Sequence, residues 1–185
     1  GITTGSTLNA ASLGGVLPVG VTGGSGLQGI THASQWLMTT NFGGDADPIT
    51  ANLVERSLSA PAGSSILGAS MTVSSGVFTF PVTGHWLIIY NYCGYDTGYS
   101  FAVNTRIQTT TNNSTYAWAT LNQQGQYDGT SNVYFTSECK HIFDVTSTAN
   151  CKVQFSVGAT AVGTQTMGDS TYMRTGFTFI RLGAT

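Results

Sequence analysis

The chain has 185 residues and a formal net charge of −2, and only 8% of its residues are charged. Six basic residues against eight acidic ones cannot build the positive face with which a nucleic-acid-binding protein neutralises phosphates. Hydrophobic residues make up 41% of the chain, which excludes a disordered protein. No apolar run approaches the ~20 residues of a membrane-spanning helix, so we expect no insertion into a membrane.

The first 32 residues differ in composition from the rest of the chain. Residues 1–30 contain nine glycines and no aromatic or charged residue. Such a segment buries too little apolar surface to fold alone. Two interpretations stay open, a flexible linker and an extended arm that becomes ordered against a partner. The aliphatic content favours the arm, with attachment expected through Leu8, Leu13, Val16, Leu17 and Val19.

Residues 33–185 are expected to form one β domain. Segments rich in Val, Ile, Thr, Tyr and Phe recur between turn residues, and no window of about 11 residues shows helical periodicity. Turns are expected at Asn112-Asn113, at Gly125–Gly129 and at 146–150. The predicted strands are Gln35–Thr40, Val77–Phe80, His85–Cys93, Tyr99–Thr109, Thr115–Asn122, Asn132–Val145, Lys152–Val157 and Tyr172–Leu182. This number of short strands predicts a sandwich of two antiparallel sheets, most simply a jelly roll.

One predicted strand, His85–Cys93, is apolar on both faces. Trp86, Ile88, Tyr90 and Tyr92 share one face, and Leu87, Ile89 and Cys93 share the other. A strand of this kind is typical of the centre of a sheet that is covered on both sides. We expect one face to serve the core and the rest of that sheet to serve a contact between subunits. The aromatic residues assigned to the core and this contact are Trp86, Tyr90, Phe177 and Phe179.

The segment from Gly76 to Trp86, GVFTFPVTGHW, resembles the Gly-x-Phe-x-x-Pro-x-x-Gly-x-Tyr signature of the complement one-q globular head. Trp86 stands at the final aromatic position of that signature. The later segment TGFTFI, residues 175–180, is similar to the last strand of the same family. The resemblance implies a jelly roll related to tumour necrosis factor, which associates as a homotrimer about a threefold axis.

A second resemblance is narrower. Residues 35–40, 44–49 and 52–56 look like segments of structural proteins of marine bacteriophages. This resemblance implies a non-enzymatic protein on the virion surface, either a head fibre, a capsid decoration protein or the tip of a tail fibre. Its arm would bind other virion proteins, and its jelly-roll head would face outward. The alternative function is a secreted or host-receptor carbohydrate-binding module.

Few residues are arranged for chemistry, and we expect no cofactor and no catalytic site. Asp45 and Asp47 have the i, i+2 spacing found in calcium loops, although a solvated turn explains them as well. Asp96 and Asp128 are expected to be turn residues by the same reasoning. The histidines at positions 32, 85 and 141 lack the close spacing of a zinc site.

The three cysteines leave two alternatives open. Cys139 and Cys151 flank a hairpin-like connection and could form a disulfide, with Cys93 free and buried. Three reduced buried thiols, which behave as small hydrophobic side chains, explain the sequence equally well.

Aromatic residues near predicted turns indicate a possible contact with host cell-surface glycan. Tyr95, Tyr99, Trp118 and Tyr127 occur beside Asn and Gln, a mixture in which rings stack on sugars and amides bind hydroxyls. Ordinary core and interface aromatics are the alternative explanation.

Overall fold

The computed structural model describes residues 29–56, 63–97, 100–127, 133–159 and 163–185. Within these ranges every regular element is a β-strand. The strands are β1 (Ala33–Met38), β2 (Phe42–Gly43), β3 (Leu53–Glu55), β4 (Thr72–Ser74), β5 (Val77–Thr79), β6 (Gly84–Asp96), β7 (Ser100–Thr110), β8 (Ala117–Tyr127), β9 (Val133–Val145), β10 (Lys152–Ala159), β11 (Gln165–Thr166) and β12 (Gly176–Gly183).

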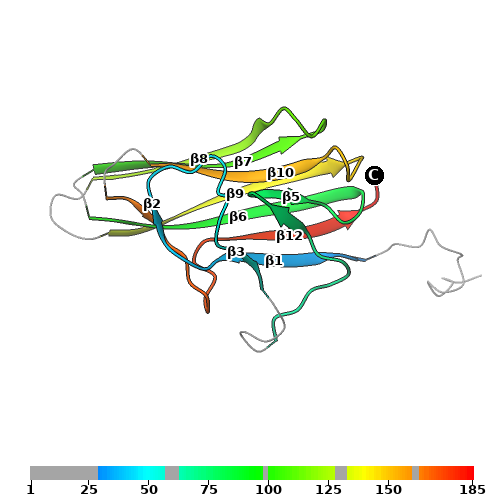
Figure 1. Ribbon diagram of the computed structural model, residues 1–185, viewed down its shortest axis with the longest axis horizontal. Coiled ribbons are helices and arrows are strands. Elements are labelled where there is room, and N and C mark those ends of the chain that lie inside the picture. Colours follow the sequence, from blue (N-terminus) through cyan, green and yellow to red (C-terminus); the bar gives the residue numbers. More distant parts are fainter. Residues whose placement is uncertain (1–28, 57–62, 98–99, 128–132, 160–162) are drawn as a thin grey trace, which may run out of the picture.

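The strands form two antiparallel sheets that face each other (Figure 1). The seven-stranded sheet has the order β2-β11-β6-β12-β1-β3, and β9 pairs with the other edge of β6. The five-stranded sheet has the order β4-β5-β10-β7-β8. Most neighbours within a sheet are distant in the sequence, which is the connectivity of a jelly roll rather than of a meander. The predicted all-β, two-sheet fold is confirmed.

All eight predicted strands are present, and β6 occupies the predicted central position because β9 lies on one edge and β12 on the other. The turn at Asn112-Asn113 is also confirmed. Asn113 adopts a φ of 56°, and Asn112 Oδ1 accepts hydrogen bonds from the backbone nitrogens of Ser114 (3.0 Å) and Thr115 (2.9 Å). The strands that the sequence did not predict are β2, β3, β4 and β11, each of two or three residues.

Two positions expected in turns, Gly125 and Asp96, lie in strands instead, and one strand starts later than expected. Gly125 lies inside β8. Asp96 is the last residue of β6 and is fully buried, with Thr164 Oγ1 donating a hydrogen bond to its carboxylate. The last strand begins at Gly176 rather than Tyr172 because Asp169 Oδ1 accepts from the backbone nitrogens of Thr171 (2.7 Å) and Tyr172 (3.0 Å), which forms a turn. Asp128 lies outside the described residues.

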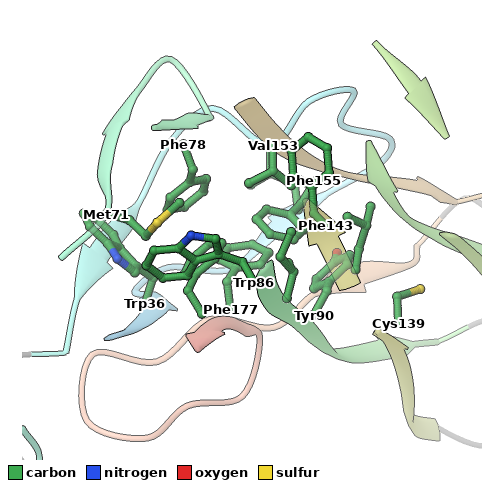
Figure 2. Close-up of a cluster of buried hydrophobic side chains, with 14 of the residues drawn as sticks. Trp36, Met71, Phe78, Trp86, Tyr90, Cys139, Phe143, Val153, Phe155 and Phe177 are labelled. Carbon is green, nitrogen blue, oxygen red and sulfur yellow. The ribbon is translucent and has the colours of Figure 1, made fainter. Parts of the chain in front are cut away.

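The core lies between the two sheets and is built mainly from aromatic rings (Figure 2). Phe78 of β5 and Phe155 of β10 come from the five-stranded sheet, with ring centroids 5.5 Å apart. They meet Trp36 of β1 and Phe177 of β12 from the opposite sheet, at 5.3 Å from Phe78 and 4.0 Å from Phe155. Burying large rings from both sheets is the main source of stability in such a sandwich.

The first strand among the described residues begins where the domain is expected to start. Strand β1 starts at Ala33, and the preceding residue is held to the last strand by a hydrogen bond from Arg181 N to His32 O (2.9 Å). Residues 1–28 of the expected arm, with all five of its proposed attachment residues, lie outside the described part of the chain.

Candidate self-association face

The surface of the seven-stranded sheet that points away from the core carries an apolar row. We call the solvent-facing side of this sheet the outer face. Leu87 of β6 pairs with Ile142 of β9 on one side and with Ile180 of β12 on the other, and Ile180 pairs with Ala33 of β1. Cross-strand partners project their side chains to the same face, so these four residues lie side by side across four strands. Ile142 is 59% exposed, and Ala33, Leu87 and Ile180 are half-buried in a single chain.

A pair of tyrosines lies on the same outer face toward the other end of β6. Tyr95 of β6 and Tyr134 of β9 are direct partners, and their ring centroids are 4.9 Å apart. Tyr134 is 63% exposed. Exposed aromatic and aliphatic residues that gather on one sheet face mark a surface suited to association.

The charges between these two apolar groups neutralise each other. Lys140 and Glu138 project from β9 onto the outer face, and Lys140 Nζ lies 2.7 Å from Glu138 Oε1. Such a half-exposed pair contributes little to stability. It does leave the part of the face between the apolar row and the tyrosine pair with one charge of each sign.

The four aromatic residues assigned to the core and subunit contact all lie on the inner side of this sheet. Trp86, Tyr90, Phe177 and Phe179 are each at most 1% exposed, because the five-stranded sheet covers them. The same strands expose Leu87, Ile89 and Ile180 on the outer face, at the alternate positions. The expectation that both faces of β6 are covered is therefore wrong for a single chain, in which the outer side is only half-buried.

Burial also changes the chemistry of two core tyrosines. Burial, with a smaller contribution from Tyr92, raises the pKa of Tyr90 well above its ordinary value. Burial raises the pKa of Tyr92 to about 12, although the hydrogen bond with Thr166 opposes the change. Neutral, buried phenols of this kind are structural residues and offer no acid or base at neutral pH.

The four candidate glycan-facing residues do not form one site. Tyr95 lies on the outer face of the seven-stranded sheet, whereas Trp118 is on β8 of the other sheet. Trp118 is 62% exposed. Tyr127 is the last residue of β8, and Tyr99 lies outside the described residues.

The candidate calcium loop is held to the five-stranded sheet by its backbone. Ala46, between Asp45 and Asp47, pairs with Val157 of β10. Asp47 Oδ1 accepts a hydrogen bond of 2.7 Å from Gln108 Nε2. Among the described residues no group of three or more His, Cys, Asp or Glu side chains is placed to hold a metal ion.

The structure shows the state of the three cysteines and the position of His85. Cys93, Cys139 and Cys151 are all free thiols, so the structure follows the reduced alternative, and Cys93 is half-buried rather than buried. His85 is the second residue of the long strand β6 and serves as a polar group at that end, with its Nδ1 2.9 Å from the carbonyl oxygen of Ala184.

The fold resembles solved structures of tumour necrosis factor-like proteins. The structure of murine APRIL at pH 8.5 matches with a TM-score of 0.54 and 7% identity, over 82% of this chain and 98% of that chain. Eiger TNF from S. frugiperda matches with a TM-score of 0.56 and 12% identity, over 83% of this chain and 93% of that one. Identities this low show a shared jelly-roll fold and nothing finer.

Comparisons of sequence add no relative. No protein-family model matches the chain, and no curated protein matches it. In the part of the chain that the structure describes, no helix has the length and apolar character needed to cross a membrane.

Proposed function

We propose that this chain is a non-enzymatic structural protein that forms a homotrimer through the outer face of its seven-stranded sheet. The observation that carries the proposal is the apolar row Ala33–Ile180–Leu87–Ile142, which crosses four strands on the side away from the core and is half-buried except for the exposed Ile142. Burial stabilises by about 25 cal/mol for each Å² of apolar surface removed from water. Covering this row and the Tyr95–Tyr134 pair with two further copies would supply the driving force for assembly.

The place of the trimer is proposed to be the surface of a bacteriophage virion. Support comes from the resemblance of residues 35–40, 44–49 and 52–56 to structural proteins of marine phages, and from the low charge content of 8%. Residues 1–32 would act as the arm that attaches to other virion proteins, with residues 33–185 as the outward-facing jelly-roll head.

Analytical ultracentrifugation of the full chain tests the assembly. We expect a trimer at micromolar concentration, and Ile142→Lys should dissociate it because it places a charge in the apolar row. Leu121→Lys is the matched control. Leu121 is an aliphatic residue, 45% exposed, on β8 of the other sheet, so this variant should remain trimeric.

Circular dichroism should show that both variants keep the β fold, which separates dissociation from unfolding. A wild-type chain that sediments as a monomer would overturn the proposed trimer. Counting the protein on intact particles by quantitative mass spectrometry tests the virion role. Hundreds of copies would indicate the capsid, a handful would indicate the tail, and its absence from particles would overturn the virion assignment.

A further inference from the structure

A line of polar side chains crosses the side of the five-stranded sheet that points away from the core, with exposed residues at its two ends and buried ones between them. We call it the polar strip, and it comprises Trp118 of β8, Arg106 and Gln108 of β7, Gln154 and Ser156 of β10, and Asp47. The strand register places these residues beside one another. Gln108 pairs with Trp118 on one side and with Gln154 on the other, and Arg106 pairs with Ser156.

Hydrogen bonds link most of the strip into one chain. Gln154 Nε2 donates to Gln108 Oε1 (2.6 Å), and Gln108 Nε2 donates to Asp47 Oδ1 (2.7 Å) and to Ser156 Oγ (3.0 Å). Gln108 and Gln154 are 4% and 8% exposed, so the two amides are fixed in place. They hold the exposed carboxylate of Asp47 at one end of the strip, where it keeps further lone pairs to accept hydrogen bonds from a ligand.

The other end of the strip is an exposed ring held in a fixed position. The guanidinium carbon of Arg106 lies 4.4 Å from the centroid of the Trp118 ring, a cation–π contact. Arg106 also lies against Gly158, where even a Cβ would be 3.4 Å from its Nη2. Because residue 158 is a glycine, no side chain there takes the space that the guanidinium of Arg106 fills. The ring of Trp118 remains 62% exposed.

Arg106 retains unused hydrogen-bonding capacity. Its Nε is buried without a hydrogen-bond partner, and none of the salt bridges between described residues includes this side chain. Buried donors of this type carry a cost unless a partner is supplied. Trp118 therefore provides an apolar surface, the half-buried Arg106 places its guanidinium beside that surface, and Asp47 provides an acceptor farther along the same strip.

We propose that the polar strip binds an oligosaccharide. The apolar face of a sugar ring would stack on Trp118, and hydroxyl groups would bind Arg106 and Asp47. Trp118 and Asp47 are separated by β7 and β10, which at about 4.8 Å per strand gives a strip on the order of 14 Å long. That length suits several linked sugars rather than one.

Other ligand classes fit the strip less well. A protein partner needs a cluster of buried apolar anchors, whereas the strip and its neighbour Leu121, the cross-strand partner of Arg106, offer one ring and one aliphatic side chain. Nucleic acid needs several positive groups, whereas the strip has one arginine and a carboxylate. The inference goes beyond the proposed function, because the strip lies within one chain and on the sheet that is not proposed to self-associate.

Glycan-array screening of the full chain, using neutral, amino-sugar and uronic-acid oligosaccharides, tests the proposal. Any binder is then titrated while tryptophan fluorescence is recorded. Trp36 and Trp86 are 8% and 1% exposed, so a change in emission on binding reports mainly on Trp118. We expect Trp118→Ala to weaken binding by roughly tenfold or more, and Trp118→Phe to restore part of it.

Matched variants separate the strip from the rest of the surface. Asp47→Asn should weaken binding while leaving the fold and the sedimentation of the chain unchanged. Tyr172→Ala removes an exposed aromatic residue, 68% exposed, outside the strip, and should bind as the wild type does. An array without any binding would overturn the proposal, and so would binding that Trp118→Ala leaves intact or a protein partner captured by the strip in place of a saccharide. None of these outcomes depends on whether the chain is trimeric or on a virion.

Discussion

The rings of Phe155 and Phe177 stack almost parallel, with centroids 4.0 Å apart and planes inclined by 22°. Phe155 belongs to β10 of the five-stranded sheet and Phe177 to β12 of the seven-stranded sheet, and both are at most 1% exposed. The stack therefore joins the two sheets at the centre of the core. The ring of Phe78 packs against Phe177, and the ring of Tyr90 packs against Phe155 (Figure 2).

Truncation of this stack should be among the most damaging single changes. We expect Phe177→Ala to lower the free energy of unfolding by about 3–5 kcal/mol, because it removes buried contacts and leaves a cavity. Phe177→Leu should cost less because it keeps most of the volume. Urea denaturation monitored by circular dichroism measures both, with Tyr172→Ala as the exposed aromatic control. A loss below about 1 kcal/mol for Phe177→Ala would show that the two sheets do not depend on this stack.

Gly94 should not tolerate a side chain. Its direct partner across the β6–β9 pair is Phe135, and a Cβ at position 94 would lie 2.2 Å from Phe135 Cζ. The ring covers the glycine, so Gly94→Ala should destabilise the protein by about 1–3 kcal/mol through overpacking. A double-mutant cycle with Phe135→Ala tests the cause. The second change should remove most of the penalty of the first, and strictly additive losses would contradict steric conflict as the explanation.

Tyr90 and Tyr92 should respond differently to loss of the hydroxyl. Tyr90 is fully buried, and its hydroxyl has no hydrogen-bond partner. Tyr92 OH accepts a hydrogen bond of 3.3 Å from Thr166 Oγ1. We expect Tyr90→Phe to leave stability unchanged or raise it by up to about 1 kcal/mol, and Tyr92→Phe to lower it by about 1 kcal/mol. Urea midpoints of the two variants provide the comparison, and equal losses would show that the Tyr90 hydroxyl is satisfied in solution.

Stability should fall at alkaline pH because of these same phenols. A tyrosine in the unfolded chain loses its proton near pH 10, whereas the pKa of Tyr92 in the fold is about 12. Between these values the unfolded chain has released a proton that the folded chain still holds, so rising pH favours unfolding, by at most about 1.4 kcal/mol per pH unit for each such group. Below about pH 10 the contribution is fully present.

The pH dependence is measured as the urea midpoint between about pH 8 and pH 12. Tyr92→Phe should give a flatter curve than the wild type, because one of the titrating groups is gone. Tyr172→Phe provides the control, since Tyr172 is 68% exposed and its removal should leave the slope as it is. Parallel curves for the wild type and Tyr92→Phe would show that this phenol does not contribute to alkaline unfolding.

Local patterns in the chain were sufficient to predict the long strands. In β6 the alternation of Trp86, Ile88 and Tyr90 with Leu87 and Ile89 is visible in the sequence, because successive side chains of a strand point to opposite faces. The errors occurred where a residue's environment depends on a distant partner. Asp96 has the appearance of a turn residue, yet pairing with β9 extends β6 to include it, and Thr164 binds its carboxylate.

The candidate sites were only partly predictable for the same reason. Trp118 was recognised as an exposed aromatic candidate, but Arg106, Gln108 and Asp47 were not linked to it. Asp47 and Gln108 are 61 residues apart in the sequence. These side chains lie near Trp118 only because the sheet places β7 between β8 and β10. Likewise, the two apolar faces of β6 look alike as sequence, and nothing local distinguishes the one that becomes core.

The amino-acid sequence alone therefore determined an all-β domain, the approximate positions of eight of the described strands and the low charge that excludes a nucleic-acid-binding surface. Tertiary structure decided which side of each strand is buried, which residues form the apolar row from Ala33 to Ile142, and which polar groups converge beside Trp118. The physical reason is that strand formation and alternation arise from neighbouring residues, whereas burial and convergence arise from pairing between strands that are far apart in the chain.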